Sequence, residues 1–354
     1  MMTVGRRRAM VDVGFLDRTR GVAAAARAVA AADPYSLRVA NFFTEDLDLL
    51  RALDRPRTVL WKMEFWGTET GGEQLPRSDG VDADAHVREM MSTGHDVIPY
   101  TFTAWGRDRL VSVAPTLGDH VVELLPIAQR PPAVPGQPFT LPGAADPGNV
   151  PLVGCGGLLH PAKGIEEVVA AFLDAYPDER AHLVCALVVE DDLTPADVLR
   201  RWSRELGGRD LSRVHVRTGP YGDWAWMCDF YRSVDVVLVG SRSDSWGRMV
   251  SEPLGFGVPT VVRRADCATN HLAPDLTLVD SFEGLGPDDF AAAVRQARAA
   301  APRLAGFVRT QYALPLVRQR FGDLLTRRLP EDVRGDFLRH TERHAADLDD
   351  LVVY

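Results

Sequence analysis

The chain has 354 residues, with 40 Lys+Arg against 49 Asp+Glu and a formal net charge of -9 at pH 7. This acidic balance argues against general nucleic-acid binding, because phosphate contacts need a clustered basic surface. Hydrophobic residues make up 46% and charged residues 25%, as in soluble globular proteins. The length favours two domains, and no apolar run approaches the roughly 18–20 residues of a membrane-spanning helix.

The N-terminal region and the cysteines predict a cytoplasmic protein. Asp12 and Asp17 interrupt any apolar core that a signal peptide would need. The four cysteines, at positions 155, 185, 228 and 267, are widely spaced and include no Cys-x-x-Cys pair. We interpret them as small buried residues in a reducing compartment, rather than as disulfide partners or zinc ligands.

In the first half, short apolar runs alternate with helical patterns, which predicts a mostly parallel sheet covered by helices. Strands are expected at 9–15, 36–43, 58–66, 96–101 and 121–125, and helices at 22–32, 46–53 and 85–91. From Arg130 to Asn149 there are six prolines and three glycines. This density excludes regular structure, so we expect a first domain at 1–130 and a linker at 131–149.

The second half repeats the alternation more clearly. Strands are expected at 150–153, 181–189, 213–217, 235–239 and 258–262, and helices at 164–175, from 195, at 223–233, at 288–300 and from about 303. These residues predict a second domain at 150–325 and a C-terminal helical segment at 326–354. Both domains are expected to be Rossmann-like, doubly wound α/β domains.

Lysine is rare in this chain, with Lys62 and Lys163 against 38 arginines, as GC-rich coding would produce. Lys62 lies in the middle of an expected strand and is interpreted as structural. Gly156 and Gly157 allow either a tight turn or a close backbone approach to a ligand. Lys163 follows them near a helix start, where the helix dipole disfavours a cation. An ordinary surface lysine is the alternative, but we favour a phosphate contact for Lys163.

A second motif follows the strand expected at 235–239. Asp244 lies in the loop before a helix, and Glu252 lies about two turns along that helix. The carboxyl ends of strands in open α/β sheets bind ligands, and the amides from Trp246 to Arg248 are expected to be unpaired donors facing an anion. Taken singly, these residues are explained as a helix cap and a solvated helix position. Together they favour a ligand site.

These two segments resemble the donor half of retaining GT-B glycosyltransferases of the family-4 type, over roughly residues 150–325. Asp244 and Glu252 hold the family's acidic-x7-Glu spacing, with Asp in place of the first Glu. Ser245-Trp246-Gly247 stands where the family has Gly-Phe-Gly. The other matching segments are Gly257-Val258-Pro259, the run from Tyr231 to Asp235, and Thr218-Gly219.

The resemblance implies a GT-B fold, in which two Rossmann-like domains face a cleft. It also implies sugar transfer from a nucleoside diphosphate donor to an acceptor hydroxyl, with retention and without a metal or other cofactor. Glu252 would hold the ribose, Asp244 the sugar hydroxyls and Lys163 the diphosphate. The implied donor-binding positions are Gly156, Gly157, Lys163, Thr218, Gly219, Asp244, Ser245, Trp246, Gly247, Arg248, Met249 and Glu252.

One family residue is missing. The arginine expected five residues before Lys163 would fall at Leu158 or Gly157, and no residue from 154 to 162 is basic. We expect Arg248, or alternatively Arg242, to supply this charge, which makes Lys163, Asp244 and Arg248 the expected catalytic group. The first alternative is a catalytically weak nucleotide- or glycan-binding protein or partner subunit of this fold. A dehydrogenase or epimerase is ranked lower, because the sequence has no complete Gly-x-Gly-x-x-Gly motif.

The first domain is expected to bind the acceptor. Candidate positions are the loop at 17–20, Glu64 and Trp66 at one strand end, and the segment from Thr101 to Trp105 at another. A small molecule is the favoured acceptor, as in bacterial natural-product biosynthesis, and a lipid or a glycan is the alternative.

Overall fold

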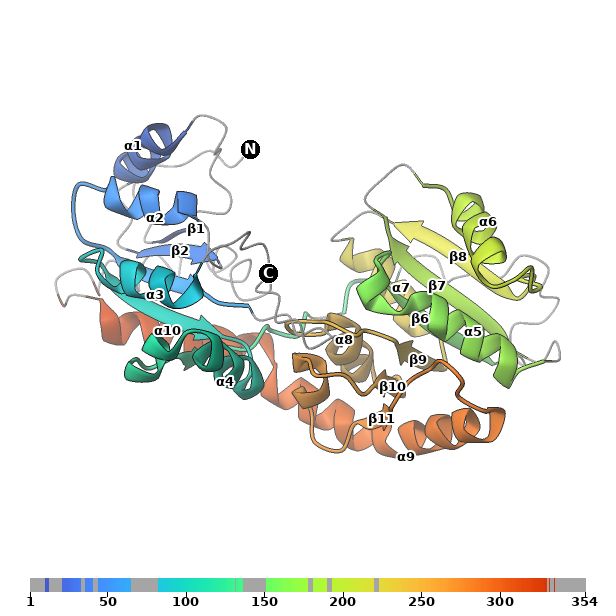
Figure 1. The fold of residues 1–354 in the computed structure, drawn as a ribbon. Helices are drawn as coiled ribbons and strands as arrows, with labels where there is room; N and C mark the ends of the chain where they lie inside the picture. Colours follow the sequence, from blue (N-terminus) through green and yellow to red (C-terminus); the bar gives the residue numbers. More distant parts are fainter. Residues whose placement is uncertain are drawn as a thin grey trace. The chain divides into compact units, whose positions relative to one another are not determined.

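The computed structural model describes residues 10–12, 21–32, 36–40, 44–64, 82–130, 132–135, 151–177, 181–189, 193–219 and 223–329, with 331 and 334. The expected acceptor positions 17–20 and 66, and most of 131–149 and 330–354, lie outside the described residues. The described chain forms two compact units (Figure 1). The first contains strands β1–β5 with helices α1–α4 and α10, and the second contains strands β6–β11 with helices α5–α9.

The first unit is built on a five-stranded sheet in the order β1-β2-β3-β4-β5, with every pairing parallel. Its strands are β1 (Met10–Asp12), β2 (Ser36–Ala40), β3 (Thr58–Lys62), β4 (Asp96–Thr101) and β5 (Glu123–Leu124). Its helices are α1 (Val22–Ala32), α2 (Thr44–Arg51), α3 (Ala83–Met91), α4 (Ala104–Val113), the short 3-10 helix η3 (Pro115–Asp119) and α10 (Leu314–Arg328).

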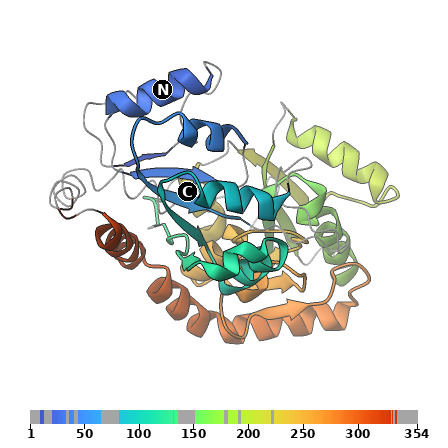
Figure 2. The same cartoon turned by 60° about the vertical axis from the view of Figure 1, so that its left-hand side comes forward.

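The two faces of this sheet are covered by different parts of the chain. Because the described strands follow chain order, right-handed crossovers place α1–α4 on one face, where they share a core with Val59 and Trp61. Helix α10 packs on the other face, with the Phe321 ring edge-on to Tyr100 at 5.9 Å between centroids. Figures 1 and 2 show α3 and α10 on opposite sides of the sheet.

The second unit is built on a six-stranded sheet in the order β11-β10-β9-β6-β7-β8, also parallel throughout. Its strands are β6 (Leu152–Leu158), β7 (His182–Val188), β8 (Val214–Gly219), β9 (Val236–Val239), β10 (Thr260–Arg263) and β11 (Thr277–Val279). Its helices are α5 (Ile165–Ala175), α6 (Pro195–Glu205), α7 (Trp224–Ser233), α8 (Arg248–Phe256), α9 (Pro287–Gln311) and the 3-10 helices η4 (Pro161–Lys163) and η5 (Ala268–His271).

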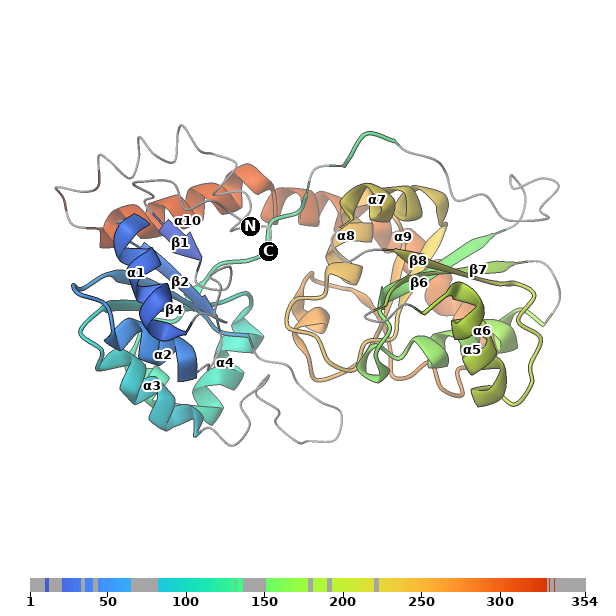
Figure 3. The same cartoon turned by 90° about the horizontal axis from the view of Figure 1, so that it is seen from above.

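The direction of winding reverses between β6 and β9 in this second sheet. Strand β6 pairs with β7 on one side and with β9 on the other, so the turns after β6 and β9 leave the same edge in opposite directions. Helices α5 and α6 share a core with one face of the sheet, and α7 and α8 lie on the other face (Figure 3). A reversal of this kind opens a crevice at the carboxyl ends of the two strands.

The boundary between the units differs from the expected one. The second unit ends at Gln311, and α10 returns to the first unit, so position 325 falls inside a helix of the other unit. The helical pattern runs on from α9 to α10 with only two residues between them. Local periodicity predicts that such residues are helical but does not determine the sheet against which they pack.

Most elements are close to their expected positions, and five differ. Strand β6 runs five residues beyond the expected end at 153, and β3 ends at Lys62 instead of 66. Helix α9 is one helix, not two, because buried residues on both sides of Pro302 keep it against the core. Helix α4 and strand β11 were not expected. No helix among the described residues is long and apolar enough to cross a membrane.

Candidate functional site

Gly156 and Gly157 belong to strand β6, so of the two expected alternatives the tight turn does not form at these glycines. A Cβ atom on Gly156 would lie 2.4 Å from the carbonyl oxygen of Ala186 on β7, so no side chain fits there. Gly157 has φ +115°, a conformation that favours glycine. The turn comes three residues later, where His160 Nδ1 accepts from the amide of Ala162 at 3.1 Å and caps η4.

Close backbone packing brings Lys163 to the end of β9. Gly164, the next residue, has φ +57°, and a Cβ atom there would lie 2.3 Å from the carbonyl oxygen of Gly240. The turn after β6 therefore touches the first residue after β9. Lys163 ends η4 at this contact and is separated from α5 by Gly164 alone, near a helix start as the sequence predicts.

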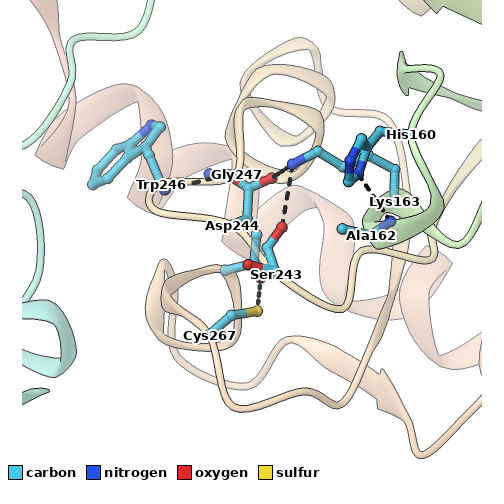
Figure 4. A network of polar contacts seen from close by, with 9 residues as sticks. His160, Ala162, Lys163, Ser243, Asp244, Trp246, Gly247 and Cys267 are labelled. Atoms are coloured by element: carbon cyan, nitrogen blue, oxygen red, sulfur yellow. Dashed lines mark hydrogen bonds and ion pairs between the residues drawn. The ribbon is translucent and has the colours of Figure 1, made fainter. Parts of the chain in front are cut away.

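Lys163 and Asp244, 81 positions apart, form an ion pair at this edge of the sheet (Figure 4). Lys163 Nζ lies 2.8 Å from Asp244 Oδ2 and donates to the carbonyl oxygen of Ser243 at 3.2 Å. The two charged side chains are 14% and 18% exposed, so water and ligands still reach them. The topology thus joins the central residues of both sequence motifs.

Asp244 also bonds to its own loop. Its Oδ1 accepts from the amide of Gly247 at 3.0 Å and from that of Trp246 at 3.4 Å (Figure 4). The expectation that these amides are unpaired is therefore wrong for Trp246 and Gly247. An aspartate reaches amides two and three residues ahead because its side chain is short. Asp244 therefore closes a turn within its loop and does not cap α8, whose N-cap residue is Gly247 and has no side-chain cap bond.

The loop that carries Asp244 is held tightly by the segment after β10. A Cβ atom on Gly247, which has φ +85°, would lie 1.9 Å from Thr269 Cγ2. The amide of Ala268 donates to the backbone oxygen of Asp244 at 3.3 Å. Trp246 is only 3% exposed, so its indole is part of the core. These contacts fix the direction in which Asp244 points.

Helix α8 presents a second group of predicted residues. Arg248 and Glu252 lie one turn apart, with Arg248 Nη1 4.0 Å from Glu252 Oε1. Met249 lies beside Gly157, since a Cβ atom on that glycine would be 3.5 Å from Met249 Cγ. Glu252 is 8% exposed, and its Oε2 accepts from the Tyr231 hydroxyl at 2.8 Å.

Burial raises the pKa of the Glu252 carboxyl, and the positive charge of Arg248 and the hydrogen bond from Tyr231 only partly offset this. A carboxyl group whose pKa is higher in the folded than in the unfolded state contributes stability at pH values below its unfolded-state pKa. This stability is lost as the pH rises through the folded-state pKa. We therefore expect Glu252→Gln to raise the melting temperature by about 1–3 °C at pH 8. The gain should shrink towards pH 4.

Scanning calorimetry of Glu252→Gln and of the parent protein between pH 4 and pH 8 measures this difference. Glu205→Gln is the matched control, because the Glu205 carboxylate is exposed and paired only with Arg201 among the described ion pairs. The control should stay within about 0.5 kcal/mol of the parent at every pH. A Glu252→Gln protein that melts below the parent at pH 8 would contradict the expectation.

The two arginines expected to replace the missing family residue have different partners. Arg242 pairs with the Glu167 carboxylate, which also binds Arg263, and its amide donates to the backbone oxygen of Ala162 at 2.8 Å. Arg242 thereby ties its loop to the first turn of α5. Arg248 instead lies beside Glu252 at the start of α8, which favours Arg248 as the source of the missing charge.

Thr218 and Gly219 lie apart from the ion pair. They end β8, and strand register places Thr218 level with Leu187 on β7 and Gly157 on β6. Two strand spacings of about 4.8 Å separate Thr218 from Gly157. A Cβ atom on Gly219 would lie 2.8 Å from the Trp226 ring. Both residues are therefore at the same edge of the sheet but outside the cluster around Lys163.

In the first unit, the expected acceptor positions also lie near strand ends. Lys62 was expected in mid-strand but is the last residue of β3, and its Nζ pairs with Glu64 Oε1 at 2.5 Å. The Lys62 ammonium lies 5.7 Å from the centre of the Phe102 ring. Thr103 caps α4, so Trp105 is a helix residue, not a strand end.

Two residues of the site were not singled out from the sequence. Tyr231 enters the resemblance only as the first residue of the run from Tyr231 to Asp235, and no sequence motif includes Gln129, whose Nε2 donates to the Glu252 carbonyl oxygen at 3.3 Å. The signal for Tyr231 was its position in the run that precedes β9. Within the described part of the chain, no group of three or more His, Cys, Asp or Glu side chains is arranged to hold a metal ion.

Sequence comparison finds relatives over part of the chain. A D-inositol 3-phosphate glycosyltransferase 2 of Catenulispora acidiphila is 31% identical over 159 residues, which is 43% of this chain and 36% of the relative. A D-inositol 3-phosphate glycosyltransferase of Nocardiopsis dassonvillei is 29% identical over 126 residues, or 35% and 28% of the two chains. The chain thus matches about a third of each relative's length. No family model matches.

Solved structures extend the similarity to most of the chain. A trehalose-6-phosphate synthase studied with bisubstrate glycomimetics superposes with a TM-score of 0.62 and 16% identity, over 88% of this chain and 79% of the other. A trehalose-6-phosphate protein from E. coli, bound with UDP-2-fluoro glucose, superposes with a TM-score of 0.54 and 16% identity, over 94% of this chain and 77% of the other. The fold is the GT-B fold with two Rossmann-like units, and the resemblance to group 1 glycosyltransferases is confirmed.

Proposed function

We propose that this chain is a glycosyltransferase that moves a sugar from a nucleoside diphosphate sugar to an acceptor hydroxyl. The main support is the meeting of Lys163 and Asp244 at the reversal point of a parallel sheet, 2.8 Å apart and still accessible. The two relatives are named glycosyltransferases, and a solved structure of the same fold is bound with UDP-2-fluoro glucose.

The proposed reaction is a single substitution at the anomeric carbon. The bond from that carbon to the diphosphate oxygen breaks, and the electron pair leaves on the diphosphate. The acceptor oxygen forms the new bond on the same face, and its proton passes to the released diphosphate. Lys163 and Arg248 would stabilise the negative charge that develops on the leaving group, because fixed cations lower the barrier to its departure.

Retention and independence of metal belong to this proposal and rest on the motif resemblance. Lys163 would bind the diphosphate, Asp244 the sugar hydroxyls and Glu252 the ribose. Of the two proposed donor-binding glycines, Gly157 lies beside Met249, and Gly156 packs against the Ala186 carbonyl oxygen on β7. Thr218, Gly219 and Ser245 complete the proposed donor contacts at the same edge of the sheet. We propose a small-molecule acceptor in the first unit, where Glu64 follows β3.

Thermal stabilisation by nucleotides tests the proposal. The protein is heated with UDP, GDP or ADP, and with their glucose conjugates, each with and without EDTA. A ligand at 100 times its dissociation constant should add about 2.7 kcal/mol of stability. Stabilisation by one nucleotide, unchanged by EDTA, and turnover of its sugar conjugate are expected. No shift with any nucleotide would end the donor-site assignment.

A nucleotide- or glycan-binding protein without turnover is the second candidate. It is favoured by the absence of a basic residue from 154 to 162 and by the pairing of Arg242 with Glu167. Stabilisation by a nucleotide sugar without release of nucleoside diphosphate, across a panel of hydroxyl acceptors, would favour it over the enzyme.

Replacement of Arg248 separates these candidates further. We expect Arg248→Ala to lower kcat/KM by about 10- to 100-fold, because a hydrogen bond to a charged group contributes on the order of 1.5–3 kcal/mol. Initial rates with the preferred donor give this ratio. Arg242→Ala is the comparison and should change kcat/KM by less than about threefold. If only the Arg242 variant loses turnover, Arg242 rather than Arg248 stabilises the charge on the leaving diphosphate.

A further inference from the structure

The ring of Tyr231 packs among aromatic side chains, and its hydroxyl group is directed to Glu252. The residue is 1% exposed on α7, and its ring lies 5.3 Å from Phe230, 5.5 Å from Phe256 and 6.4 Å from Trp224, measured between centroids. Packing on these sides fixes the direction of the phenol. Its hydroxyl donates to Glu252 Oε2 at 2.8 Å and lies 3.4 Å from the Met249 sulfur.

Glu252 is thereby held at more than one point. Tyr231 binds its Oε2, and Arg248 Nη1 lies 4.0 Å from its Oε1. Gln129 donates to its backbone oxygen and so holds the main chain at this residue. A glutamate side chain has several rotatable bonds and normally loses that freedom when it binds a ligand. Here the freedom is already restricted before any ligand arrives.

On the basis of the proposed function, we propose that Tyr231 is a positioning residue that orients the Glu252 carboxylate to accept hydrogen bonds from the donor ribose. A carboxylate has about four lone-pair sites, so the oxygen bound by Tyr231 can accept a second hydrogen bond. Two oxygens held in one plane match the two adjacent hydroxyls of a ribose. Without the phenol hydroxyl, the carboxylate would have to be ordered by the nucleotide itself.

The protonation states support this role. Among the residues that the structure describes, the titratable and charged groups facing the Glu252 carboxylate are Arg248 on its own helix, Tyr231 and Cys228 on α7, and Arg130 before β6. Burial and the Glu252 charge raise the pKa of Tyr231 well above its ordinary value, so the phenol remains a donor at every working pH. Burial raises the pKa of Glu252, and the hydrogen bond from Tyr231 partly offsets that rise, which favours the ionised, accepting form.

The decisive experiment compares ribose with dideoxyribose. Binding of UDP, GDP and ADP, and of their 2′,3′-dideoxy counterparts, is measured by titration calorimetry on the parent chain and on Tyr231→Phe. We expect the variant to bind its preferred ribonucleotide about tenfold more weakly, which corresponds to about 1.4 kcal/mol. Binding of the dideoxy counterpart should be unchanged, because it has no hydroxyls for Glu252.

The controls separate positioning from general damage. Tyr176→Phe makes the same change at the end of α5 and should leave both affinities at the parent value. Tyr231→Phe in the Glu252→Gln background should cause no further loss, and this double variant leaves no buried charge without its donor. In Tyr231→Phe alone, the acid-side fall in ribonucleotide affinity should begin at a higher pH than in the parent.

The outcomes are distinct. Equal affinity of Tyr231→Phe and parent for the ribonucleotide would overturn the positioning role and leave the proposed function standing. An equal loss for ribonucleotide and dideoxynucleotide would also overturn it, because it would show only a structural effect. If the parent binds none of the nucleotides, the proposed function fails and the positioning role fails with it.

Discussion

Lys163→Ala is expected to lower kcat/KM for the preferred donor sugar by about 100- to 1000-fold while the protein remains folded. The ammonium of Lys163 is the cation nearest Asp244 in the proposed donor site, at 2.8 Å. Loss of one fixed group that stabilises transition-state charge typically costs about 2.7–4 kcal/mol. Folding should survive because Asp244 keeps its bonds to the amides of Trp246 and Gly247.

Initial rates over a range of donor concentrations give kcat/KM for Lys163→Ala, and circular dichroism checks the fold. The other lysine of the chain provides a matched control for nucleotide binding. Lys62 is 15% exposed and paired with a carboxylate, much like Lys163 at 14%, but it lies in the first unit. Lys62→Ala should bind the nucleotide with parental affinity. A folded Lys163→Ala protein with parental turnover would remove the assigned role of Lys163.

Gly164→Ala is expected to destabilise the second unit by roughly 3–5 kcal/mol. Two effects add here. The backbone of Gly164 has φ +57°, which costs a residue with a Cβ about 1–2 kcal/mol. The new Cβ atom would also lie 2.3 Å from the carbonyl oxygen of Gly240. Relief of this clash requires the turn after β6 to separate from β9, which displaces Lys163 from Asp244.

Urea unfolding measures the loss, and Gly207→Ala separates the two effects. Gly207 has φ +66°, but a Cβ atom added there would have no other atom within 4 Å. The free energy of unfolding of this control should therefore fall by only about 1–2 kcal/mol, the cost of the backbone conformation. An equal decrease in the free energy of unfolding for the two variants would mean that the backbone near Gly240 shifts at little cost. The contact would then not determine the position of Lys163.

Most strands of the two sheets were predictable, because each of these strands is a short apolar run with turn signals on either side. The expected strand at 96–101 and helix at 22–32 match β4 and α1 at both ends. The helix expected from 195 begins there as α6, where Thr194 and Asp197 form a capping box. In each case a local cause determines the structure, so a single sequence is sufficient.

The site was predictable as a pair of segments but not as a set of contacts. Their spacing after strands placed Lys163 and Asp244 at one sheet edge, as observed. The bonds from Asp244 to its own loop depend on the path of residues 245–247, which the packing of Thr269 against Gly247 determines. Such a contact joins distant segments, and residue pattern alone does not contain it.

The return of α10 to the first unit has a consequence for synthesis of the chain. The strands of the second unit are complete by Val279 and its last helix by Gln311, so this unit can bury its core as soon as it leaves the ribosome. The first unit is made earlier but has one face of its sheet uncovered until α10 emerges, with Phe321 to pack on Tyr100. The segment translated first is therefore the one completed last, and nascent chains are expected to depend on chaperones during that interval.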